Sequence, residues 1–442
     1  MRKADDSTAV VVSADWRGIK FWLAVMLTGV GTGVSAGALY LLLNWVQHVA
    51  WPGGGNLLEA ASHASLARHL LILVGAGLLT GLGQLVLSGL SSGNGIDINA
   101  AIWFSAGRLP ALRTLGSAIL SIVLVGMGVS LGREGAPKQA GAVFGNWLSD
   151  AARLSDEQRR LLVACGAGAG MAAAYGVPLG GALFSLEVLR GLLALRLVLP
   201  ALLASTIATL VAWNVVPNEP LYVFPAYAMS ASVIIWSLFL GPITGFVSVG
   251  YVRAVRWADS HKPKGWKRLL APLIVLGALG AVSFPFPQIL GNGQAVSELA
   301  FRGGVGPLML LGILVLKPIA TVMSVRSGAP GGLFTPSLTV GAMLGGCLGY
   351  GWSLLWPGSP LGLYSVLGAA AMLAATTQGP ISTVVLMFEM TGHNRAFIAP
   401  LLLAVTTATL VARLIEPRSI YDAKLSDEQV AARIAARAPA SS

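Results

Sequence analysis

The stretch Gly132-Arg133-Glu134-Gly135-Ala136-Pro137 places two opposite charges between glycines, directly after the apolar run Ile119–Leu131. A charged pair flanked by glycines indicates that an apolar helix is interrupted there. Pro137 is tolerated in the first turn of a new helix, where its missing N–H costs nothing. The free N–H groups and the positive dipole end of that turn favour an anion. The stretch therefore predicts a helix break that carries an anion site.

Glu134 brings a negative charge from the protein itself to this break. Its carboxylate could compete with a mobile anion for the site, and protonation would then release it. The alternative is a structural ion pair with Arg133 that seals two helices together. On the residues alone, the two interpretations carry equal weight.

The composition of the whole chain decides the environment of this break. The protein has 442 residues, of which 55% are hydrophobic and only 11% are charged. Soluble domains carry roughly 25% charged residues, so this chain could not cover its surface in water. Soluble enzymes, nucleic-acid binders and disordered scaffolds are thereby excluded, and nucleic acid is not an expected partner. An all-α polytopic membrane protein in contact with lipid is predicted instead.

A membrane span needs roughly 20 apolar residues, and many segments of the chain approach or exceed that length. Others are interrupted by Gly, Pro or charge, which is tolerated at membrane depth only where the backbone is buried or lines a cavity. Interrupted helices are typical of a transporter or channel. The uninterrupted candidates are Ile19–Val46, Leu70–Leu90, Ala111–Leu131, Leu192–Val216, Ala231–Val252, Leu269–Leu290, Val305–Val325 and Phe397–Leu414; the interrupted ones are Gly132–Leu148, Leu161–Leu189, Ser327–Trp356 and Leu363–Met390.

The chain also repeats itself. Gly93-Asn94-Gly95 recurs as Gly291-Asn292-Gly293, and Met171-Ala172-Ala173-Ala174 is echoed by Leu373-Ala374-Ala375-Thr376 at a nearly constant offset. Echoes in the same order predict two structural halves. We place the first membrane repeat at 19–225 and the second at 226–424, with an N-terminal segment (1–18) and a C-terminal tail (425–442) outside them.

The basic residues indicate how these halves are oriented, because Lys and Arg concentrate in cytoplasmic loops. The loop between Arg253 and Arg268 is rich in them, whereas the linker 217–225 has none. Both termini carry Lys and Arg and are predicted to be cytoplasmic. The first half then begins inside and the second outside, which is an inverted repeat with a substrate site near the midplane.

Two further constellations bear on that site. The stretch 327–336 reads SGAPGGLFTP, and the backbone amides around Leu333 and Phe334 could point at an ion. Its alternative is a tight interhelix loop, which its registry with the break at Gly132 makes less favoured. The stretch 92–97 reads SGNGID, where the Asn94 side chain can donate to an anion and Asp97 can cap a helix.

In this order, the three stretches resemble the filter motifs of the CLC chloride channel and transporter family. The family patterns GSGIP, GREGP and GxFxP read here GNGID, GREGAP and GGLFTP. The resemblance runs from about Phe21 to about Lys424. It implies a CLC-type fold with broken and tilted helices, and a homodimer in the inner cell membrane with one chloride pathway per subunit. It implies neither a cofactor nor a metal.

The resemblance also implies residue roles. Glu134 is the expected gate for a small anion such as chloride, and it would be the group that exchanges protons. The remaining expected anion-binding positions are Asn94, Gly95, Ile96, Arg133, Gly135, Leu333, Phe334, Thr335 and Tyr421.

Departures from the family patterns affect the expected mechanism. Asn94 replaces the filter serine, which raises the possibility of another anion such as fluoride. Asp97 stands in place of a proline, and we favour a capping role for it. Val188 occupies the position of the inner glutamate that feeds protons to the gate in family antiporters. Its neighbour Glu187 is a weaker candidate for the proton pathway, since it would face about 100° away around a helix.

These departures leave several functions open. The sequence favours channel-like or loosely proton-coupled chloride transport. The alternatives are obligate chloride/proton exchange and export of another anion such as fluoride. A polytopic membrane enzyme that uses Glu134 and Arg133 is the alternative from a different class. We also expect Glu187 and Glu389 to make structural hydrogen bonds at helix ends.

Overall fold

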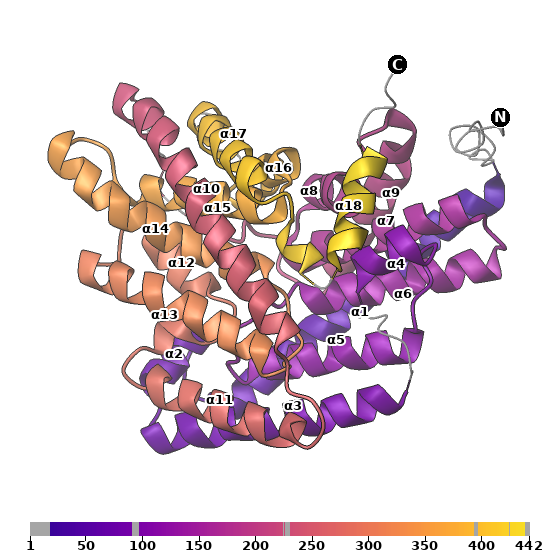
Figure 1. Cartoon of the computed structure of the whole chain (residues 1–442), viewed down its shortest axis with the longest axis horizontal. Helices are drawn as coiled ribbons and strands as arrows, with labels where there is room; N and C mark the ends of the chain where they lie inside the picture. Colours follow the sequence, from indigo (N-terminus) through magenta and orange to yellow (C-terminus); the bar gives the residue numbers. More distant parts are fainter. Residues whose placement is uncertain are drawn as a thin grey trace.

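The computed structural model describes residues 18–90, 97–223, 225, 230–392, 397–423 and 425–437. The described chain is helical and contains no strand (Figure 1). The first half comprises α1 (Ile19–Ala50), α2 (Leu57–Ser62), α3 (Leu66–Gly89), α4 (Ile98–Phe104), α5 (Ala111–Gly126), α6 (Gly135–Ala151), α7 (Asp156–Tyr175), α8 (Pro178–Phe184), a π-helix (Ser185–Arg190) and α9 (Leu195–Ala212). The second comprises α10 (Ala231–Ser260), α11 (Lys267–Ser283), a 3₁₀ turn (Pro287–Ile289), α12 (Gln294–Phe301), α13 (Pro307–Arg326), α14 (Phe334–Leu355), α15 (Leu361–Thr377), α16 (Pro380–Met390) and α17 (Ile398–Ile415), followed by a 3₁₀ turn (Ile420–Asp422) and α18 (Asp427–Arg437).

The long helices follow one another in the same order in the two halves. The long helices α1 and α10 open them, the pairs α6–α7 and α14–α15 form their centres, and α9 and α17 close them. The halves meet at α3 against α11 and at α8 against α16, and α3 and α11 lie side by side at one edge of the molecule in Figure 1. The predicted fold class, an all-α membrane protein built as an inverted repeat, is confirmed.

Helix lengths agree with a membrane protein whose helices are tilted. Within the described chain, seven helices are long and apolar enough to cross a membrane. At 1.5 Å per residue, the 32 residues of α1 span about 48 Å. The hydrocarbon core is only about 30 Å thick, so a helix of this length must tilt to remain within it.

Three of the predicted spans end several residues earlier than expected, and the span predicted for Leu192–Val216 stops at Ala212 as α9. The span predicted for Leu269–Leu290 stops at Ser283 as α11, because Pro285 and Pro287 follow and cannot continue a helix. The span predicted for Ala111–Leu131 stops at Gly126 as α5, and Gly128 then adopts a φ of +97° that turns the chain away.

The centre of each half is a pair of helices in unusually close contact. Nearly every residue of α7 and of α15 is buried. A methyl group on Gly141 of α6 would overlap the backbone of Gly166 in α7, and one on Gly368 of α15 would overlap the backbone of Gly341 in α14. Small residues allow helices to approach this closely in a membrane, and glycine takes that role at equivalent places in both halves.

The C-terminal segment contains a helix, α18, which the sequence reasoning did not predict. Its Arg433 is buried and forms a two-pronged ion pair with Asp422. The same Asp422 carboxylate accepts hydrogen bonds from the backbone N–H and the hydroxyl of Ser419, both at 2.8 Å. The helix is thereby tied to the 3₁₀ turn that carries Tyr421.

Candidate anion-binding site

The breaks at 132–137 and 327–336 meet in the interior. Gly132 and Gly332 form an isolated antiparallel bridge, in which the Gly132 N–H donates to the Gly332 carbonyl at 2.7 Å and the Gly332 N–H donates to the Gly132 carbonyl at 2.8 Å. Directly after these strand-like crossings, α6 begins at Gly135 and α14 at Phe334. The bridge therefore fixes two helix N-termini, one from each half, next to each other.

The Glu134 carboxylate occupies the N-terminus of α14. Its Oε1 accepts the Phe334 backbone N–H at 2.8 Å. Its Oε2 accepts the Tyr175 hydroxyl at 3.0 Å and the Thr335 hydroxyl at 3.3 Å. The side chain is 0% exposed. A backbone N–H, two hydroxyls and a helix N-terminus together stabilise a bound anion. Glu134 therefore lies where a mobile anion would also be stable.

Two glycines leave room for this carboxylate. A methyl group added to Gly132 or to Gly332 would overlap the oxygens of Glu134. Gly132 and Gly332 therefore bridge the halves and also contact the carboxylate, and both positions require a residue without a side chain.

Arg133 does not pair with Glu134. Its guanidinium lies 5.3 Å from the centroid of the Tyr175 ring, a distance at which a cation is attracted to an aromatic face. Tyr175 in turn stacks on Phe334, with ring centroids 5.9 Å apart. The alternative in which Arg133 and Glu134 form a sealing ion pair is therefore wrong, because the carboxylate uses neutral donors of the second half and of α7.

The other predicted anion-binding residues fall into three groups. Gly135 and Leu333 line a cavity of about 160 Å³ beside the site, and Tyr421 lines the same cavity. The backbone of Phe334 and the hydroxyl of Thr335 contact Glu134 directly. The stretch that carries Asn94, Gly95 and Ile96 lies outside the described residues.

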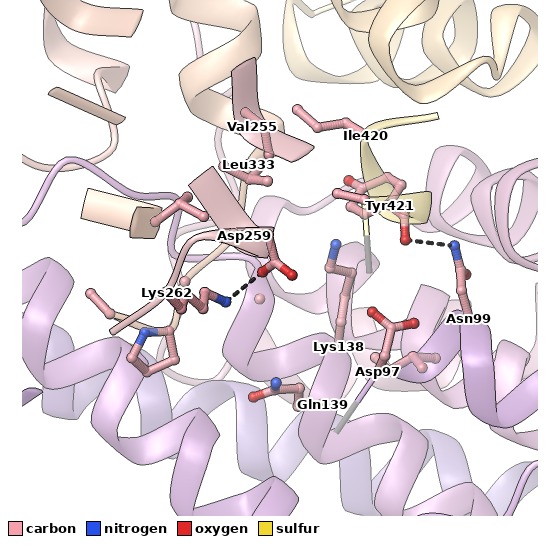
Figure 2. Close-up of a pocket in the computed structure, with 18 of the residues that line it drawn as sticks. Asp97, Asn99, Lys138, Gln139, Val255, Asp259, Lys262, Leu333, Ile420 and Tyr421 are labelled. Atoms are coloured by element: carbon pink, nitrogen blue, oxygen red, sulfur yellow. Dashed lines mark hydrogen bonds and ion pairs between the residues drawn. The ribbon is translucent and has the colours of Figure 1, made fainter. Parts of the chain in front are cut away.

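Tyr421 presents its ring and hydroxyl at the inner cavity. The ring packs edge-on against Phe184 with centroids 5.6 Å apart, and the backbone carbonyl accepts the Asn99 side-chain amide at 3.4 Å. The hydroxyl is buried and has no hydrogen-bond partner among the described residues. Figure 2 shows Tyr421 and Lys138 facing each other in this cavity.

Sequence reasoning missed two residues of the site, Tyr175 and Lys138. Tyr175 ends α7 at the break before Pro178, and a hydroxyl at a broken helix end was the available signal. Lys138 lies one turn after Glu134, and i, i+4 residues share a helix face. Since an ionisable residue within an apolar membrane segment is a functional candidate by default, Lys138 should have been selected with Glu134.

Asp97 and the pair Glu187 and Glu389 take the structural roles expected of them. Asp97 Oδ1 accepts the Ala100 N–H at 2.9 Å and caps α4. The remaining carboxylates cap each other's helices. Glu187 accepts the N–H groups of Ile381 and Ser382 at the start of α16, at 3.1 and 2.6 Å. Glu389 accepts those of Leu179 and Gly180 at the start of α8, at 3.1 and 2.6 Å.

The fold and the site together define a helical membrane protein whose interrupted helices direct their N-termini at a buried anion position. The match with known proteins agrees with this class. Residues 76–413 match the family described as voltage-gated chloride channel. The chain belongs to this family, the CLC family, so the resemblance of the three motifs is confirmed.

Individual relatives cover most of the chain. A ClcB-like chloride channel protein of Ralstonia nicotianae is 33% identical over 366 residues, which are 80% of this chain and 84% of the relative. An H⁺/Cl⁻ exchange transporter ClcA of Salmonella arizonae is 28% identical over 438 residues, 94% of this chain and 90% of the relative. The crystal structure of a slow cyanobacterial Cl⁻/H⁺ antiporter superimposes with a TM-score of 0.80 at 22% identity, over 94% of this chain and 99% of that chain.

Proposed function

We propose that this protein exchanges chloride for protons across a membrane, with Glu134 as the gate of the anion pathway. The observation that carries the proposal is the Glu134 carboxylate at the N-terminus of α14, where Phe334, Tyr175 and Thr335 donate to it. A carboxylate in an anion site competes with a mobile anion for the same donors. Uptake of one proton ends this competition, because it removes the negative charge of the carboxylate. The name of the ClcA relative, an H⁺/Cl⁻ exchange transporter, supports exchange over the channel-like mode that the sequence favoured.

The proposed cycle uses only these groups. Ionised Glu134 holds the α14 N-terminus and closes the pathway. Protonation removes its charge, so the helix N-terminus no longer stabilises the side chain over a mobile anion. Chloride then takes the Phe334 N–H and the neighbouring hydroxyls, and the neutral side chain moves away. Loss of the proton on the other side returns the carboxylate and displaces the anion.

Protons that approach Glu134 from the inner side find valine, not a carboxylate, at position 188. Val188 is buried and apolar. Both carboxylate oxygens of Glu187 accept backbone N–H groups of α16, and no hydrogen bond among the described residues joins Glu187 to Glu134. We propose that protons reach Glu134 through water in the cavity next to Gly135 and Tyr421, and we assign Glu187 a structural role.

The assignment of partners follows from the family. We propose a homodimer in the inner cell membrane with both termini cytoplasmic, chloride and protons as the transported ions, and no cofactor. Membership in a family of ion transporters and channels argues against the membrane-enzyme alternative. The fluoride alternative rests on Asn94 alone.

Reconstituted protein tests the proposal. Liposomes loaded with chloride, fluoride or nitrate are diluted into anion-free buffer, and anion release and external pH are recorded together. We expect chloride release accompanied by proton movement in the opposite direction, and faster release as pH falls, because more Glu134 is protonated. Chloride release without any proton movement would overturn exchange in favour of passive conduction, and fluoride release alone would replace chloride as the substrate.

A further inference from the structure

Lys138 is a buried cation whose charge no carboxylate of the described chain neutralises by contact. It is 6% exposed, and its ammonium forms no ion pair and no hydrogen bond with any described residue. Buried charges are almost always paired, because an unpaired one loses its hydration without compensation. Among the described residues, Glu134 and Asp97 are the acidic side chains near enough to act on this charge, and neither forms an ion pair with it, so the ammonium faces the cavity without a protein acceptor.

A second buried lysine shows what a structural role looks like in the same protein. Lys317 of α13 is fully buried, and its ammonium donates to the carbonyls of Ile289 and Gly291 at 2.9 and 2.7 Å. Its donors are thus satisfied by the backbone of the preceding loop. Lys138 has no such carbonyls, so its three donors remain available.

Aromatic rings hold the Lys138 ammonium in place. It lies 4.3 Å from the centroid of the Tyr421 ring and 5.3 Å from that of Phe184. Both distances are within the roughly 6 Å over which cation–π attraction acts. The rings position the cation without using its N–H groups, which leaves the ammonium preorganised for a further ligand.

The space beside Lys138 can accept such a ligand. The cavity that Lys138 and Tyr421 line has a volume of about 160 Å³, whereas about 10–15 Å³ by the same measure holds one water molecule. The buried Tyr421 hydroxyl, also without a partner among the described residues, is a second available donor. An ammonium has donors only, so the complementary ligand is an anionic acceptor.

The remaining charges of the cavity leave Lys138 as its available cation. Lys262 is paired with Asp259 at 2.5 Å, and both line the same space. Asp97 also lines it; its carboxylate caps α4 and attracts the Lys138 charge from nearby without forming an ion pair with it. Figure 2 shows Lys262 directed at Asp259, and Lys138 directed at Tyr421.

We propose that Lys138 binds the transported anion directly, in the inner cavity one helical turn from Glu134. This inference rests on the proposed anion transport and adds a full positive charge to a pathway otherwise built from peptide dipoles and hydroxyls. The anion would contact the ammonium on the side that the rings of Tyr421 and Phe184 leave open. Glu134, which occupies the α14 N-terminus in this conformation, leaves the inner cavity as the place where chloride binds.

Calorimetric titration of the purified protein with chloride tests the proposal. Lys138→Met keeps the aliphatic stem and removes the charge, and we expect chloride affinity to fall about ten-fold, a change of about 1.4 kcal/mol. Lys138→Arg keeps the charge on a larger, planar head group and should retain affinity within about three-fold, a change of about 0.7 kcal/mol. The matched control is Lys262→Met, which removes a cation already paired in the same cavity and should change affinity less than two-fold.

A second measurement separates anion binding from a merely structural role. Chloride that binds the folded protein raises its unfolding temperature, and this shift should be present in the wild type and absent in Lys138→Met. In liposomes, Lys138→Met should raise the KM for chloride more than it lowers the maximal rate.

Several results would overturn the inference. Unchanged chloride affinity in Lys138→Met would do so, as would a variant that unfolds even at saturating chloride, which would assign Lys138 to the fold. Loss of proton coupling with intact chloride affinity would make it a proton carrier instead. A wild-type protein that moves no chloride would refute the proposed function itself. This failure is distinct from a failure of the Lys138 proposal, because the variants are compared with a wild type that transports chloride.

Discussion

The two helix breaks at the centre of the molecule have the same geometry and carry different chemistry. Each follows a long apolar helix, crosses the other through the bridge between Gly132 and Gly332, and starts a new helix with a proline in its first turn. The first break contributes a carboxylate, Glu134. The second contributes the backbone N–H of Phe334 and the hydroxyl of Thr335, and both donate to that carboxylate.

This difference shows how a repeated fold acquires a function. The repeat supplies two helix N-termini at one point, and either could stabilise an anion. Because only the first half places a carboxylate there, that half carries the gate and the second half carries its receptor. Two carboxylates at this point would repel each other. Two helix N-termini without a carboxylate would leave no group for a proton to neutralise.

The largest effect is expected from Glu134→Gln, which removes the asymmetry. Glutamine keeps the size of the side chain and an oxygen that can accept the Phe334 N–H, but it takes up no proton. We expect chloride flux to persist while its coupling to protons is lost, as measured by anion release and pH in the same liposomes. The outcome that contradicts the gate assignment is unchanged proton movement.

The next largest effect is expected where the two breaks touch. Gly332→Ala places a methyl group on the oxygens of Glu134, so the carboxylate cannot occupy the α14 N-terminus as it does here. We expect chloride flux to change at least ten-fold in liposomes, with a destabilisation of about 1–3 kcal/mol from overpacking. The matched control is Gly312→Ala in α13, where a methyl group meets no atom within 4 Å. If both variants behave like the wild type, the close fit of the gate is wrong.

A smaller effect is expected from the two Asn-Gly pairs that the sequences of the halves share. Asn94→Ser restores the family's filter residue and should raise the preference for chloride over fluoride by a few-fold, on the scale of one hydrogen bond to an anion. Its counterpart Asn292 accepts the Gln294 N–H within a turn, at 3.1 Å, so Asn292→Ser should leave the anion ranking unchanged. Efflux with each anion measures this. An identical shift in both variants would refute a filter role for Asn94.

The sequence predicted the parts of this arrangement that depend on local chemistry. Proline and glycine positions predicted the breaks before α6, α8, α14 and α16, and the capping role of Asp97 follows from its place before α4. The contacts that complete the site join distant segments. Tyr175 reaches Thr335, and Lys138 reaches Tyr421, because helix packing sets which faces meet, and packing is not encoded in any one segment.

The smallest effect on transport is expected from the carboxylates that the halves do use symmetrically. Glu187 caps α16 and Glu389 caps α8, each through two N–H groups. Glu187→Gln and Glu389→Gln should therefore both destabilise the protein, by about 1–2 kcal/mol for the weakened charged hydrogen bonds, and both lower the unfolding temperature in detergent. Neither should alter the ratio of chloride to protons. If Glu187→Gln reduces coupling while Glu389→Gln does not, the symmetry is broken here as well, and Glu187 belongs to the proton pathway rather than to the scaffold.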